Sequence, residues 1–79
     1  MSRIIKIGTP TCGPCKVAEN LLNKYNVKHV SYNAVDAEDI CTQYRVGSVP
    51  TILKLDDDGN EISRLVGGDC LQAHKIQEL

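Results

Sequence analysis

The chain has 79 residues, of which 42% are hydrophobic and 24% are charged, and its formal net charge is −1 at pH 7. This length predicts a single domain over residues 1–79 with a small core, since such a chain buries only about 60–65% of its unfolded surface. The ordinary composition excludes a disordered chain. The near-neutral charge excludes a basic surface for nucleic acid or an anionic membrane, and no apolar run could span a bilayer.

The spacing of apolar residues predicts the element order β-α-β-α-β-β-α. We expect strands over residues 3–8, 28–33, 51–56 and 61–66, and helices over residues 11–26, 36–44 and 70–79. We expect Thr11, Asp36 and Asp69 to cap the three helices, because each is of a residue type that favours the N-cap position. Asp69 and Gln72 have the spacing of a capping box. Asp-Gly and Gly-Asn at residues 57–60 predict a hairpin turn. No linker, repeat or low-complexity segment interrupts this order.

The four cysteines divide into a close pair and two distant residues. Cys12 and Cys15 form a C-x-x-C motif, whereas Cys41 and Cys70 stand far apart and are expected to be incidental thiols. The N-terminus carries no long apolar leader, so we expect a reducing, cytoplasmic environment. In such an environment a close pair performs chemistry or binds metal more often than it cross-links the fold.

The position of the motif at a predicted helix start favours redox chemistry. Cys12 is expected at the first helical position, where unpaired N–H groups and the helix dipole stabilise a thiolate, and Lys16 adds a nearby cation. Pro14 suits the first turn, where its missing N–H is not needed, and Gly13 leaves room for an incoming chain. Cys15, one turn further in, is expected to be more buried and to resolve a mixed disulfide.

Two alternatives remain for the motif. It could be half of a zinc site, which would need further ligands from Cys41, Cys70, His29 or His74, or it could be a purely structural disulfide. The two histidines are otherwise expected at the surface.

The motif and two later segments together resemble a known family. The sequence T-C-G-P-C-K at residues 11–16 is similar to the active-site motif of thioredoxins, and Y-R-V-G-S-V-P-T at residues 44–51 is similar to their cis-proline segment. Val66-Gly67-Gly68 resembles the glycine turn before the family's last helix. The resemblance covers nearly the whole chain and lacks only the extra N-terminal strand and helix of full-size thioredoxins. It implies a minimal thioredoxin fold of the α/β class, with a four-stranded mixed sheet flanked by three helices.

The resemblance implies an electron carrier that reduces protein disulfides by dithiol exchange. Cys12 would be the nucleophile and Cys15 the resolving thiol, with Gly13 and Pro14 shaping the motif between them. Pro50 would be a cis-proline lying against the pair. The substrate would be bound by the backbone of Val49, in a form of strand addition, and by Thr11, Gly67 and Gly68.

The same resemblance implies the partners. They would be disulfide-containing proteins and a thioredoxin-reductase-type flavoprotein, with no bound cofactor, no metal and a monomeric state. Glutaredoxins offer a competing template in which glutathione is the donor. The chain shares with them Val49-Pro50 and Gly67-Gly68-Asp69, but has Thr9 where a lysine is expected. A further alternative is a binding module that uses the fold only as a scaffold.

Two positions depart from the thioredoxin pattern. Thr11 stands where the family usually has tryptophan, and Lys6 stands where it has a buried aspartate that is thought to assist proton transfer with the resolving thiol. No carboxylate base is therefore expected for Cys15. Lys6 is expected to extend to solvent at the strand end, with Tyr32 of the neighbouring strand as a candidate neighbour.

Overall fold

The computed structural model describes residues 2–79. The strands are β1 (Arg3–Gly8), β2 (Val30–Asn33), β3 (Thr51–Leu55) and β4 (Glu61–Val66). The helices are α1 (Gly13–Lys24), α2 (Glu38–Gln43), the 3₁₀ helix η1 (Gly67–Leu71) and α3 (Ala73–Gln77). No helix within this described part of the chain is long and apolar enough to cross a membrane.

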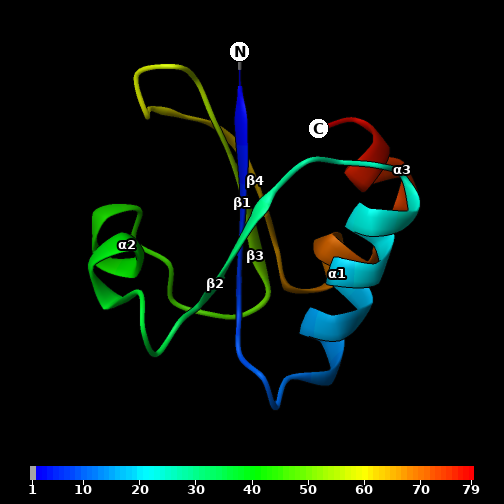
Figure 1. Ribbon diagram of the computed structural model, residues 1–79, viewed down its shortest axis with the longest axis horizontal. Coiled ribbons are helices and arrows are strands. Elements are labelled where there is room, and N and C mark those ends of the chain that lie inside the picture. Colours follow the sequence, from blue (N-terminus) through cyan, green and yellow to red (C-terminus); the bar gives the residue numbers. More distant parts are fainter. Residues whose placement is uncertain (1) are drawn as a thin grey trace.

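The four strands form one mixed sheet in the order β2-β1-β3-β4. β1 and β2 are parallel and are joined through α1, whereas β1 with β3 and β3 with β4 are antiparallel. Figure 1 shows α1 and α3 on one side of this sheet and α2 on the other. The predicted fold class, a four-stranded mixed sheet flanked by three helices, is confirmed.

The two faces of the sheet bury separate apolar clusters. The cluster on the α1 side is made of Ile4, Ala18, Leu22, Ile52, Cys70 and Ile76. The cluster on the α2 side is built on Ile7, Leu53 and Leu55, against which α2 packs through Ile40. Side chains alternate along β1, so Ile4 and Ile7 fall on opposite faces, as strand geometry requires. Aliphatic side chains fill this core because the chain has no Phe or Trp.

The predicted starts of the first two helices are wrong by one or two residues. Cys12, not Thr11, is the N-cap of α1. Asp36 does not cap α2. Its backbone N–H and that of Ala37 both donate to the Asn33 carbonyl, so these residues form a turn, and α2 starts only at Glu38. The preceding strand is likewise shorter than predicted.

The predicted capping box of the last helix is also wrong. Gly67, at φ +58°, opens the 3₁₀ helix η1, and α3 starts only at Ala73. The Asp69 carboxylate accepts a hydrogen bond from Lys75 Nζ at 2.9 Å instead of capping the helix. Leu71 ends this 3₁₀ helix and is 39% exposed.

Candidate active site

Three segments that are distant in the sequence lie together at one end of the sheet, where β1 ends and β3 begins; this end is called the sheet edge here. Ile7 pairs with Thr51, and Thr51 pairs with Val66. The residues after Ile7, before Thr51 and after Val66 therefore lie at the same edge. These are the loop after Gly8, the residue before β3, which is Pro50, and the start of η1. The Gly67 N–H donates to the Pro50 carbonyl at 2.9 Å, which ties two of these segments together.

The C-x-x-C motif forms the start of α1 at this edge. Cys12 has extended backbone angles, φ −88° and ψ 112°, and its sulfur accepts a hydrogen bond from the Cys15 N–H at 3.1 Å. Cys12 was predicted at the first helical position; it lies one residue earlier, so that its own sulfur caps the helix. The two cysteines form a disulfide with a Cα–Cα distance of 5.2 Å. Cys12 is half-buried, whereas Cys15 is only 1% exposed.

The buried sulfur of Cys15 lies directly against the end of β1. A Cβ atom added to Gly8 would come within 2.9 Å of Cys15 Sγ and 3.0 Å of its Cβ. Such contacts are closer than packed atoms allow, so this position requires glycine for lack of space rather than for its backbone angles. From the sequence alone, Gly8 is predicted only to end the first strand.

The proline segment lies beside the motif at the sheet edge. The Val49–Pro50 peptide bond is cis, Pro50 is buried, and Val49 is half-buried. Thr51 Oγ1 donates to the Ser48 carbonyl at 2.8 Å, which fixes the entry into β3. The other predicted site residues lie in the same region of the fold, and those that are exposed are Thr11, Gly13, Pro14 and Gly68.

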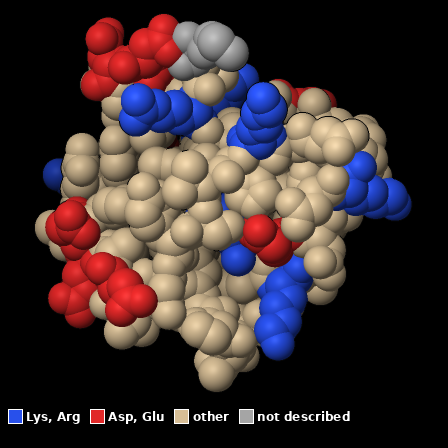
Figure 2. Space-filling model, in the orientation of Figure 1, with Lys and Arg blue, Asp and Glu red and all other residues tan. Residues whose placement is uncertain are grey.

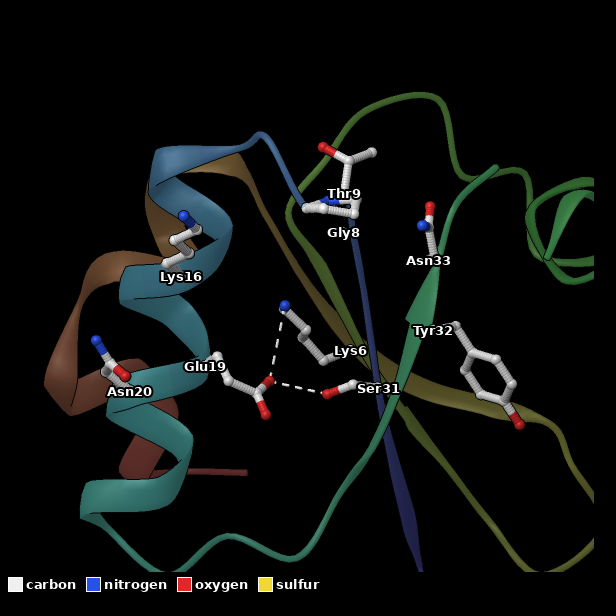
Figure 3. Close-up of a pocket in the computed structure, with 10 residues that line it drawn as sticks. Lys6, Gly8, Thr9, Lys16, Glu19, Asn20, Ser31, Tyr32 and Asn33 are labelled. Carbon is white, nitrogen blue, oxygen red and sulfur yellow. Dashed lines mark hydrogen bonds and ion pairs between the residues drawn. The ribbon is translucent and has the colours of Figure 1, made fainter. Parts of the chain in front are cut away.

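The structure contradicts the expected solvent exposure of Lys6. This residue is 9% exposed, lies on the central strand β1, and its Nζ atom is 3.7 Å from Glu19 Oε2 on α1. Tyr32 is not its neighbour, because the register pairs Lys6 with Ser31 and places Tyr32 on the other face. Figure 3 shows Lys6, Glu19 and Ser31 converging between β1, α1 and β2, while Tyr32 points away. A cavity of about 450 Å³ opens at this place.

Glu19 is the centre of a polar network that the sequence did not predict. Its carboxylate accepts a hydrogen bond from Ser31 Oγ at 2.8 Å and lies 3.0 Å from His29 Nε2. Burial raises the pKa of Glu19, but the hydrogen bonds from His29 and Ser31 and the charges of His29 and Lys6 outweigh this effect and lower it. The prediction that His29 lies at the surface is wrong, since its side chain is 7% exposed. This network follows from the parallel register of β1 and β2, which local sequence patterns do not determine.

The remaining two cysteines are separate from each other, and Cys70 touches the site because its thiol donates a hydrogen bond to the Pro50 carbonyl at 3.5 Å. Cys70 packs in the α1-side cluster and Cys41 against the α2-side cluster. Burial raises the pKa of the Cys70 thiol to about 11. Within residues 2–79, no three His, Cys, Asp or Glu side chains are grouped so that they could hold a metal ion.

Comparison with known proteins defines the class to which this fold and motif belong. The family model described as Thioredoxin matches residues 2–78. The SPbeta prophage-derived thioredoxin-like protein YosR of Bacillus subtilis is 32% identical over 65 residues, which cover 82% of this chain and 81% of that protein. The chloroplastic thioredoxin M-type of Spinacia oleracea is 38% identical over 56 residues, but these span only 31% of its length.

Solved structures agree with the sequence matches. The thioredoxin of Malassezia sympodialis superposes with a TM-score of 0.82 at 19% identity and covers 98% of this chain and 70% of its own. Oxidised mitochondrial thioredoxin 3 of Saccharomyces cerevisiae gives a TM-score of 0.74 at 26% identity, over 99% and 78% of the two chains. The chain belongs to the thioredoxin family. With its C-x-x-C pair at disulfide distance, it is a thiol–disulfide oxidoreductase.

The contact between Gly8 and Cys15 gives a first prediction. Gly8→Ala should destabilise the oxidised protein by roughly 1–3 kcal/mol, because the added methyl group forces the Cys15 side chain out of its position. Gly47→Ala is the matched control, since a Cβ at Gly47 meets nothing within 4 Å. Urea unfolding followed by circular dichroism measures both variants. Equal stability of the two would contradict the close packing described for Gly8.

Proposed function

We propose that this protein reduces disulfide bonds in other proteins, using Cys12 as the nucleophile and Cys15 as the resolving thiol. The observation that carries the proposal is the unequal exposure of the two sulfurs at the start of α1. Cys12 is half-buried and can be reached by a substrate, whereas Cys15 is fully enclosed. In the reduced state, the backbone N–H groups at the start of α1 favour a thiolate on Cys12.

The proposed reaction is two successive thiol–disulfide exchanges. The Cys12 thiolate attacks one sulfur of the substrate disulfide. A mixed disulfide forms, and the other substrate sulfur leaves as a thiolate that takes up a proton. The Cys15 thiolate then attacks Cys12 Sγ and breaks the mixed disulfide, releasing the second substrate thiol. Two electrons pass to the substrate, and the protein is left with the Cys12–Cys15 disulfide.

The residues around the motif support binding of an extended substrate segment. Val49 lies beside the motif at the sheet edge, and its backbone can pair with an incoming strand. Val66 is 40% exposed and lies at the same edge, where its side chain offers an apolar contact for the substrate. Thr11, Gly67 and Gly68 complete this proposed surface.

We propose a thioredoxin-reductase-type flavoprotein as electron donor, with no cofactor bound to the chain itself and a cytoplasmic location. Two features disfavour glutathione. Thr9 stands where the glutaredoxin template has a lysine, and the Asp69 carboxylate, expected to hold glutathione in that template, is engaged by Lys75.

Substitution of each active-site cysteine tests the assigned roles. Cys12→Ser should abolish the reduction of insulin disulfides, because no nucleophile remains at the exposed position. Cys15→Ser should also stop turnover, but it should accumulate a mixed disulfide on Cys12 that mass spectrometry detects. Cys41→Ser is the control and should retain activity. Full activity of Cys12→Ser would show that the proposed mechanism is wrong.

Coupled reduction tests the proposed donor. The oxidised protein is offered NADPH with thioredoxin reductase and, separately, NADPH with glutathione and glutathione reductase. Turnover of an insulin substrate should be at least about tenfold faster with thioredoxin reductase. Faster turnover with glutathione would instead favour the glutaredoxin-like alternative.

A further inference from the structure

Lys6 occupies a position where an ammonium group is costly. It lies on the central strand β1, between β2 and β3, and shares the α1-facing side of the sheet with Ile4 and Ile52. Removing a cation from water without compensation costs several kcal/mol, so a lysine persists in such a place only when another group compensates for the lost hydration. The groups around the Lys6 Nζ atom therefore indicate which negative charges the ammonium stabilises.

Two groups lie close to the Lys6 ammonium. The first is the Glu19 carboxylate, 3.7 Å away. The second is the sulfur of Cys15. A methyl group at Gly8 would be 3.2 Å from Lys6 Nζ and 2.9 Å from Cys15 Sγ, so both atoms border the same small space above Gly8. Lys6 thus lies between the carboxylate and the sulfur that resolves the mixed disulfide.

Glu19 is held in place by groups other than Lys6. Ser31 Oγ and His29 Nε2 lie 2.8 and 3.0 Å from its two oxygens, and His29 Nδ1 lies 2.8 Å from the Val27 carbonyl. These contacts join α1 to β2 and to the loop before it. In Figure 2 an acidic group flanked by basic groups is visible where α1 and β2 face one another. A fixed carboxylate gives the Lys6 side chain a defined direction.

We propose that Lys6, oriented by Glu19, is a positioning residue for the resolving step, whose ammonium stabilises the Cys15 thiolate. This inference rests on the proposed function. After Cys12 has attacked a substrate, Cys15 must lose its proton before it can attack Cys12 Sγ. Burial opposes the charged sulfur, and a neighbouring cation offsets that cost. The proton passes to bulk water, and the cavity beside Lys6 is large enough to admit water molecules.

Other charged or titratable groups line the cavity or lie beside Lys6 or Glu19, and their effects must be separated from that of Lys6. Lys16 and Glu19 lie on α1, and His29 precedes β2. Cys70 and Asp69 lie in η1, and Lys6 is close enough to Cys70 to act on its thiol electrostatically. Among the described residues, the groups whose effects must be separated from that of Lys6 are Cys12, which is bonded to Cys15, the cavity residues Lys16 and Glu19, His29 beside Glu19, and the pair Asp69 and Cys70.

The resolving step can be measured separately from the first attack. In a Cys41→Ala background, the reduced protein is mixed in a stopped-flow instrument with an aromatic disulfide that releases a coloured thiolate. The first release depends on the concentration of the reagent and reports the attack by Cys12. The second release is independent of that concentration and reports the attack by Cys15. Both rates are recorded as a function of pH.

Lys6→Met should slow the second release at least about tenfold near neutral pH and move the midpoint of its pH profile upward by about one unit or more. The first release should stay within about twofold. Lys6→Arg should restore the second release, since it restores the cation. Lys28→Met is the control, because it removes an exposed lysine in the loop before β2. Lys6→Gln replaces Lys6→Met if the latter does not fold.

Glu19→Gln tests whether Cys15 loses its proton with help from the Lys6 cation or from the Glu19 carboxylate acting as a base. The amide oxygen in the place of Oε2 still accepts from Ser31 and still faces Lys6 Nζ, so Lys6 keeps its direction while the negative charge is removed. The midpoint of the second release should therefore stay the same or fall. A raised midpoint and a slower second release in Glu19→Gln would identify the carboxylate as the proton acceptor and overturn the proposal. An unchanged second release in Lys6→Met would also overturn it. Absence of the first release in the parent protein would instead contradict the proposed function.

Discussion

The Cys12 sulfur caps the helix whose start it occupies, and the rest of the site depends on this interaction. Its hydrogen bond from the Cys15 N–H uses one of the backbone donors that the first turn of a helix cannot satisfy internally. The same donors can stabilise a thiolate when the disulfide is reduced. Structural capping and chemical activation therefore use the same groups at the start of α1.

The sheet determines what surrounds this helix start. Because β1 is central and antiparallel to β3, the loop after Gly8 and the residue before Thr51 emerge at one edge. The absence of a side chain at Gly8 lets α1 approach closely enough to bury the Cys15 sulfur against β1. The two cysteines thus differ in exposure, with Cys15 packed against β1 and Cys12 half-buried at the helix start. That difference gives the exchange reaction its order, with an accessible nucleophile and an enclosed resolving thiol.

Local patterns were sufficient for the order of the elements, because it depends on period and turn residues, whereas the mixed four-stranded sheet was predicted from the resemblance to thioredoxins. The strands Arg3–Gly8 and Glu61–Val66 agree with the predicted limits, since alternation and the flanking glycines define them. The network of Lys6, Glu19 and Ser31 was not predictable in this way. It depends on the register between parallel strands and on which turn of α1 faces β1, and both are set by tertiary packing. Asp69 failed as a predicted cap for a similar reason, because a 3₁₀ turn intervenes before α3.

The ionisation of Cys12 in the reduced protein tests the central claim most directly. Thiolate absorbance, or the rate of alkylation at Cys12 located by mass spectrometry, is followed against pH. We expect a midpoint well below the value of about 8.5 for a free thiol, because the N–H groups at the start of α1 favour the anion. A midpoint at or above the free-thiol value would show that the helix start provides no activation of Cys12.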